Sequence, residues 1–139
     1  MRQGKQNISV GLLMMAAFMA FGFLLIYLRD FAPDKAQWIA DYAVGAHFEA
    51  RLAHVHGNLF GFLNIVIGYL IWQLPVPPAT ATWVSRLALV GLLMPLGIVA
   101  ELAFGAPPLF VLVGAIAMVA AVAMLGVAVT RLGPASVRA

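Results

Sequence analysis

Cysteine is absent from the 139-residue chain, and charged residues make up only 9% of it. Without cysteine the protein has neither disulfide bonds nor thiolate metal sites. Ordinary soluble domains carry roughly one quarter charged residues, so this chain has too few to cover a water-exposed surface. Because 64% of its residues are hydrophobic, we expect the lipid bilayer to be its solvent.

The net charge of +3 comes from scattered Lys and Arg residues near the ends of apolar stretches. They form no basic cluster, so they indicate membrane orientation rather than nucleic-acid binding. More of them lie on the cytoplasmic side if the N-terminus is inside: Arg2, Lys5, Arg86, Arg131 and Arg138, against Arg29, Lys35 and Arg51 outside. We therefore predict a multi-pass protein of a bacterial-type inner (cytoplasmic) membrane, with both termini cytoplasmic.

A membrane-spanning helix needs about 20 mostly apolar residues. Four stretches meet this length and predict an all-α, integral membrane four-helix bundle that forms a single domain over residues 1–139. These stretches are about 9–28, 48–74, 83–104 and 108–130. No small-x-small cleavage site precedes the charged pair Arg29-Asp30 at the end of the first stretch, which favours a retained helix over a signal peptide. Between the first two stretches we expect an interfacial loop with a short surface helix as one possibility, and a solvated His47 at its end.

Polar side chains are concentrated in the second apolar stretch, which contains His54, His56, Asn58 and Asn64. Such groups are costly in hydrocarbon, so they point to a functional site. At about 100° per residue, Arg51 and Asn58 share a helix face with His54, while His56 points almost the opposite way. The two histidines therefore do not ligate one metal ion from a regular helix.

Gly57 and Gly61 lie on the side of the helix from which His54 projects. Small residues let another helix, or a flat cofactor, approach the backbone closely. An imidazole beside such a surface is what haem ligation by one histidine requires, and Arg51 is placed to pair with a haem propionate. Helix packing is the alternative explanation for the glycines, and a hydrogen bond between helices is the alternative for His54.

Glu101 is an acidic residue within the third apolar stretch, about one turn from its outer end. The predicted topology places it at the depth of His54, where it is a candidate acid or base, a partner that orients a histidine, or the ion-pair partner of Arg51. For His56 we expect an interhelical contact or a subunit interface. For Asn64 we expect a packing hydrogen bond, with a role in the site as the alternative.

The second and third stretches carry a recognisable order of residues: Arg51-x-Ala53-His54, then a glycine-rich turn with Gly61, and later Ser85-Arg86-Leu87. This order resembles the styrene oxide isomerase family of small four-helix membrane enzymes, over most of the chain in architecture but at few positions in identity. The resemblance implies a trimer that holds haem b at subunit interfaces, with His54 as the iron ligand. It also implies that ferric haem acts as a Lewis acid on the epoxide of a small hydrophobic substrate, giving a carbonyl product.

Asn58 and Glu101 are the candidates for shaping or polarising the substrate pocket of such an enzyme. The chain departs from the family pattern at Phe60, where an asparagine is expected, and at Pro95 and Ala103, where an aspartate and a tyrosine are expected. Haem binding is therefore implied more strongly than isomerase activity. The alternatives are a membrane haem protein without isomerase activity, such as a small cytochrome or gas sensor, and an accessory membrane subunit without a cofactor.

Overall fold

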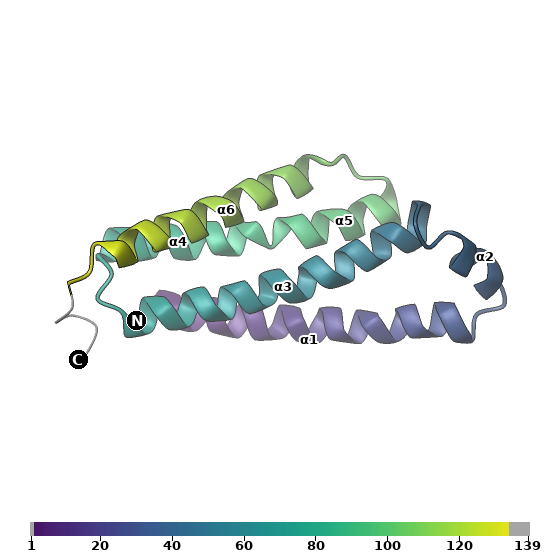
Figure 1. The fold of residues 1–139 in the computed structure, drawn as a ribbon, viewed down its shortest axis with the longest axis horizontal. Coiled ribbons are helices and arrows are strands. Elements are labelled where there is room, and N and C mark those ends of the chain that lie inside the picture. Colours follow the sequence, from purple (N-terminus) through teal and green to yellow (C-terminus); the bar gives the residue numbers. More distant parts are fainter. Residues whose placement is uncertain (1, 134–139) are drawn as a thin grey trace.

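The computed structural model describes residues 2–133; Met1 and residues 134–139, among them the basic residue Arg138, lie outside that part. Within it the chain forms helices and no strand (Figure 1). In chain order the helices are α1 (Arg2–Asp30), α2 (Lys35–Ala40), α3 (Gly45–Gln73), α4 (Pro78–Gly91), α5 (Leu93–Phe104) and α6 (Leu109–Thr130). The predicted all-α bundle is confirmed.

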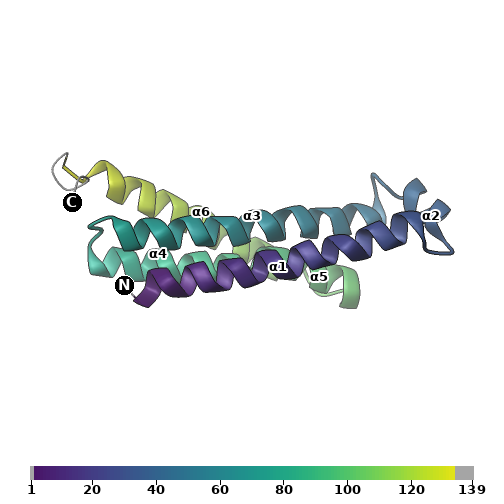
Figure 2. The ribbon, with the colours of Figure 1, turned by 90° about the horizontal axis from the view of Figure 1, so that it is seen from below.

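Four helical stretches are long and apolar enough to cross a membrane: Gly4–Asp30, Gly45–Gln73, Pro78–Phe104 and Leu109–Thr130. They run side by side (Figures 1 and 2). Large apolar side chains point away from the bundle, with Phe23 74% and Val119 70% exposed. Such exposure suits contact with lipid tails and would be unfavourable in water.

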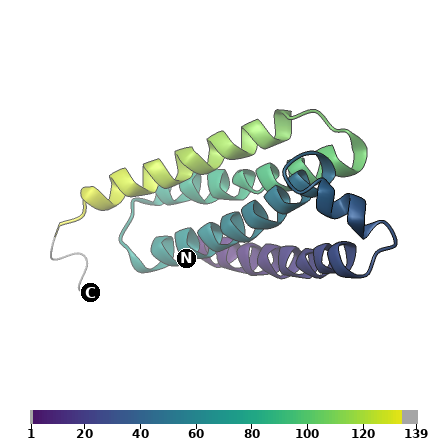
Figure 3. The ribbon, with the colours of Figure 1, turned by 45° about the vertical axis from the view of Figure 1, so that its right-hand side comes forward.

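The short helix α2 lies at one end of the bundle, between the end of α1 and the start of α3 (Figure 3). A short helix was one possibility expected for this segment, and the structure contains it. Its connections to α1 and α3 are brief, so it stays close to the first turns of α3. This end of the bundle carries the start of the second span, Gly45–Gln73, where His54 is found.

The third span is not one continuous helix, because α4 ends at Gly91 and α5 begins at Leu93. This break was not predicted. Pro95 has no backbone N–H to donate to the preceding turn, which weakens the helix at this point. In addition, α6 comes so close that a side chain at Gly114 would collide with the backbone of Met94. Proline and close packing together explain the interruption.

Glycines set the distance between α1 and α3. A Cβ added at Gly4 would lie 2.5 Å from the carbonyl oxygen of Gly68, and the reverse distance is also 2.5 Å. A Cβ added at Gly11 would likewise lie 2.5 Å from the carbonyl oxygen of Gly61. The two backbones are therefore in direct contact, as is common where small residues line the interface between membrane helices.

A hydrogen-bonded polar group joins three helices in the half of the bundle away from α2. Asn7 and Asn64 are fully buried and Ser85 is 2% exposed. The Asn7 amide donates to the Asn64 side-chain oxygen at 2.8 Å and to the Ser85 carbonyl at 3.1 Å, while the Ser85 hydroxyl donates to Asn7 Oδ1. Asn64 also donates to the carbonyl oxygens of Phe60 and Ala88 at 3.0 and 2.9 Å. The packing hydrogen bond predicted for Asn64 is confirmed.

Candidate functional site

His54 is held by a contact between α3 and α1. Its Nδ1 lies 2.8 Å from the carbonyl oxygen of Phe18. A carbonyl oxygen can only accept, so Nδ1 carries the proton and Nε2 holds the free lone pair. Gly22 makes room for the ring, because a Cβ there would lie 2.8 Å from His54 Cε1.

Nε2 of His54 has no hydrogen-bond partner within residues 2–133, and it is not a buried atom. The Phe18 carbonyl therefore fixes the orientation of the ring, and Nε2 is left without a partner in the described chain. A backbone carbonyl that fixes Nδ1–H in this way is the usual support of a histidine that ligates a metal. No cluster of three or more His, Asp or Glu side chains suited to a metal ion occurs in the described chain, so His54 offers a single ligand.

Gly57 and Gly61 face α1. The ring of Phe18 occupies the space where a side chain at Gly57 would lie. At Gly61 an added Cβ would be 2.7 Å from Met15 Cγ and 3.0 Å from the Gly11 carbonyl oxygen. Helix packing, the alternative explanation, is what the structure shows within this chain. The expected cofactor surface on these glycines is covered by α1.

Arg51 turns toward the chain that precedes α3. Its guanidinium carbon lies 3.7 Å from the centre of the Tyr42 ring, and its Nη1 donates to the Tyr42 carbonyl oxygen at 3.2 Å. Stacking of a guanidinium on an aromatic face is favourable. The ion pair between Arg51 and Glu101, one of the alternatives from the sequence, is not formed; within residues 2–133 the ion pair observed joins Arg29 and Asp30 at 2.8 Å.

A groove of about 480 Å³ lies at the α2 end of the bundle, lined by Leu25, Ile26, Arg29, Asp30, Ile39, Tyr42, His47 and Arg51. Two of its residues are arginines, Arg29 from α1 and Arg51 from α3. His54 follows Arg51 by three residues, which is roughly 4.5 Å along a helix axis, and it projects toward the same neighbour, α1. His54 does not itself line the groove; it lies one helical turn beyond Arg51, which does.

His47 forms one wall of this groove, and it is 6% exposed rather than solvated as expected. Its ring stacks on Trp38 at 4.4 Å between ring centres, and its Nδ1 lies 2.6 Å from the Trp38 carbonyl oxygen. Tyr42 meets the same ring edge-on at 5.2 Å. These contacts attach α2 to the start of α3 and fix the shape of the groove.

Asn58 and Glu101 are not brought together around His54. The Asn58 amide donates to the His54 carbonyl oxygen at 2.9 Å, a bond within α3. Glu101 lies on α5, and its Oε1 is buried without a hydrogen-bond partner in the described chain. Of the positions that depart from the family pattern, Phe60 and Pro95 are buried in the packing between helices, and Ala103 is exposed.

The expectation for His56 was an interhelical contact or a subunit interface, and the hydrogen bond that it makes stays within α3. Its Nδ1 lies 2.9 Å from the carbonyl oxygen of Leu52 in the same helix. Its ring meets Phe60 edge-on, with the ring centres 6.2 Å apart. As expected from the helical periodicity, it lines a different groove from the one beside His54.

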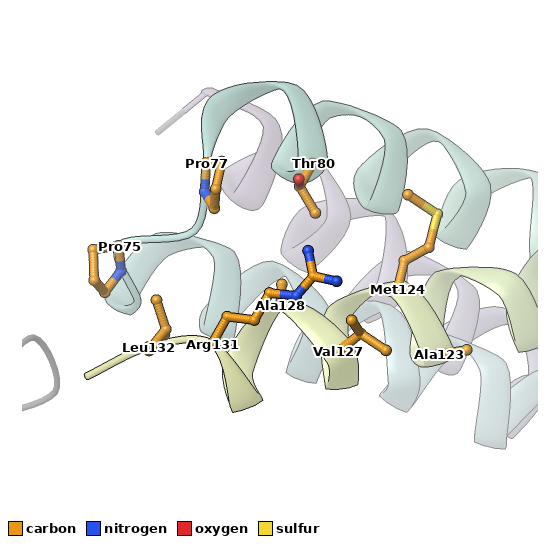
Figure 4. Close-up of a pocket in the computed structure, with 9 residues that line it drawn as sticks. All are labelled: Pro75, Pro77, Thr80, Ala123, Met124, Val127, Ala128, Arg131 and Leu132. Atoms are coloured by element: carbon orange, nitrogen blue, oxygen red, sulfur yellow. The ribbon is translucent and has the colours of Figure 1, made fainter. Parts of the chain in front are cut away.

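A third groove, of about 480 Å³, lies at the other end of the bundle, between the start of α4 and the end of α6 (Figure 4). Arg131 extends from α6 across this groove toward α4, and Pro75 and Pro77 lie at its outer edge. The groove contains no histidine or acidic side chain. It is therefore separate from the His54 site.

Sequence reasoning missed the groups of α1 that position His54. Gly22 could have been singled out in the sequence, because a glycine inside an apolar span often marks a place where two helices approach closely. The Phe18 carbonyl could not, because a backbone carbonyl is present in every residue. Arg29 was read only as a charge that sets orientation. Comparison of the chain with protein-family models, with curated proteins and with solved structures finds no match. The contacts just described therefore carry the argument about function.

Proposed function

We propose that this protein is a membrane haem protein in which His54 ligates the iron of haem b, and that it isomerises an epoxide to a carbonyl compound. The observation that carries the proposal is the 2.8 Å contact between His54 Nδ1 and the Phe18 carbonyl oxygen. It leaves Nε2 accessible and able to ligate a metal on a helix that is long and apolar enough to span a membrane. The resemblance to the styrene oxide isomerase family supplies the reaction.

The groove next to His54 has residues suited to both parts of haem b, the charged propionates and the apolar porphyrin ring. Arg29 and Arg51 line the groove at the outer end of the helices; Arg29 is already paired with Asp30 of the same groove, so Arg51, which has no carboxylate partner in the described chain, is the guanidinium that suits a propionate. Leu25 and Ile26 give the same groove apolar surface, as a porphyrin ring requires. The glycine surface of α3 is not part of this fit, since α1 covers it.

Bound ferric haem would supply a Lewis acid for the epoxide oxygen. His54 is held in one orientation by the Phe18 carbonyl of α1, while the apolar span keeps water from the epoxide. Asn58 lies one turn from His54 on the same face of α3, and its amide already donates to the His54 carbonyl oxygen, a bond that competes with one to a substrate oxygen. The reaction breaks one C–O bond, moves a hydride between the two carbons and forms C=O, so it consumes no water, oxidant or reductant.

Glu101 keeps its place as a candidate catalytic group because its Oε1 is buried and without a partner in the described chain. It makes no hydrogen bond or ion pair with His54, Arg51 or Asn58. The proposed substrate is small and hydrophobic, and it reaches the site from the bilayer.

The proposed orientation places the start of α1 and the end of α6 in the cytoplasm. Both lie at the same end of the bundle (Figure 1), and Lys5 and Arg131 are among the basic residues near that end. Basic residues favour the cytoplasmic side of a membrane. The His54 site then faces the outer side of a bacterial-type inner membrane.

A haem protein without isomerase activity is the second candidate. It is favoured by the geometry of Asn58, whose amide is bonded to its own helix, and of Glu101, which is not assembled with His54. A five-coordinate haem with one axial histidine would suit a gas sensor better than an electron carrier with two protein ligands. Haem binding is common to both candidates, and only activity separates them.

The decisive experiment uses protein expressed with an adequate haem supply and purified in detergent. We expect a Soret absorption band in the wild type and in His56→Ala, and its loss in His54→Ala. Haem-loaded protein incubated with an aryl epoxide should then release the corresponding aldehyde, measured by gas chromatography. A haem band without aldehyde supports the second candidate. Absence of the band in the wild type would refute both and favour an accessory subunit.

A further inference from the structure

The second face of α3 borders a groove that the proposed haem site does not use. It has a volume of about 500 Å³, and its lining includes His56, Phe60, Met94, Ala115 and Met118. These residues come from α3, α5 and α6. Apart from His56, every lining residue is apolar. A volume of this size lies in the range of small-molecule sites, roughly 300–1,000 Å³.

His56 presents a hydrogen-bond acceptor at this groove. Its Nδ1 lies 2.9 Å from the Leu52 carbonyl oxygen, so Nδ1 carries the proton and Nε2 is left with the lone pair. Nε2 makes no hydrogen bond within residues 2–133 and is not a buried atom. The ring is also steadied by its edge-on contact with Phe60. The acceptor is therefore fixed in direction and open.

The depth of His56 makes this open acceptor costly. His56 is eleven residues from the start of α3 at Gly45, which is roughly 16 Å along the helix axis. Lipid tails carry no hydrogen-bond donor, and polar groups in hydrocarbon without partners are unfavourable. Neither the bilayer nor the apolar lining of the groove can satisfy Nε2. A ligand that brings a donor would.

We propose that this groove binds a small, membrane-soluble molecule that has an apolar body and one hydroxyl group, and that the hydroxyl donates to Nε2 of His56. The apolar body lies against α6 and Met94 in place of lipid tails. A molecule without a donor gains only the apolar contacts, so the site should distinguish an alcohol or phenol from its ether. This site is independent of His54 and of haem.

The test uses the full chain in lipid nanodiscs, with ¹⁵N-labelled histidine and two matched probes, 4-propylphenol and its methyl ether. The phenol should shift the unprotonated-nitrogen resonance of His56 in a saturable manner, and it should bind about tenfold more tightly than the ether, which is the effect of one hydrogen bond of about 1.4 kcal/mol. The resonance is assigned by its absence in His56→Phe. The resonances of His47 are the internal control.

Two variants separate the parts of the site. His56→Phe should bind the two probes with equal affinity, because it keeps the apolar groove and removes the acceptor. Ala115→Phe should weaken both probes, because it fills the groove without touching His56. Equal affinity of the wild type for phenol and ether overturns the proposal. It is also overturned if cross-linking through position 115 shows that a second copy of the chain covers the groove.

Discussion

Removing the polar contacts between Asn7 and Asn64 should weaken the helix bundle measurably. Both side chains are fully buried, and Asn64 makes two hydrogen bonds to other helices, one with Asn7 at 2.8 Å and one with the Ala88 carbonyl oxygen at 2.9 Å. Bonds of this kind between membrane helices contribute about 0.6–2 kcal/mol each. We therefore expect Asn64→Ala to lower the free energy of unfolding by about 1–4 kcal/mol.

The assay is reversible unfolding in mixed micelles with increasing dodecyl sulfate, followed by far-ultraviolet circular dichroism. Asn58→Ala is the matched control, because its amide bonds only to a carbonyl of its own helix; we expect a loss below about 0.5 kcal/mol. A double-mutant cycle with Asn7→Ala cancels the effect of the lost volume, and it should give a coupling energy of about 0.6–2 kcal/mol. A coupling energy near zero would refute the reasoning.

Three further outcomes follow from the packing and the site. Gly114→Leu should destabilise the bundle by several-fold more than Gly126→Leu in the same unfolding assay, because the backbone of α5 lies against Gly114 whereas nothing lies within 4 Å of a side chain at Gly126. Gly22→Leu should displace the His54 ring and reduce the haem content of the purified protein, and an unchanged Soret band would contradict this. Arg51→Gln should leave the Soret position unchanged and weaken haem retention about five- to tenfold in a haem-transfer assay, since it removes one charged hydrogen-bonding partner; equal retention would show that Arg51 does not contact haem.

The sequence was sufficient for the fold class because apolar length is a direct consequence of bilayer thickness. It was insufficient at the third span, where the helix ends at Gly91 and restarts at Leu93. Pro95 was visible in the sequence, but proline alone does not decide whether a membrane helix bends or breaks. The close approach of α6 at Gly114 supplies the missing cause, and it becomes visible only once the helices are packed.

At the candidate site, too, the sequence predicted what depends on the helix alone and missed what depends on how the helices pack. Periodicity correctly separated His54 from His56, because it depends only on helical geometry. It also placed Gly57 beside His54, but it did not show whether a cofactor or another helix covers that glycine; Phe18 of α1 does. The partner of His54 is a backbone carbonyl, which has no signature in any residue type. Asn7 went unnoticed because it precedes the stretch from which the first span was predicted.

The measurement that tests the central claim most directly is chemical rescue of the iron ligand. A His54→Gly variant should purify without haem, and addition of millimolar imidazole together with haemin should restore a Soret band at one haem per chain. His56→Gly should retain haem without imidazole. If His54→Gly instead binds haem as the wild type does, with the same spectrum and no response to imidazole, then His54 does not hold the iron and the proposed function is wrong.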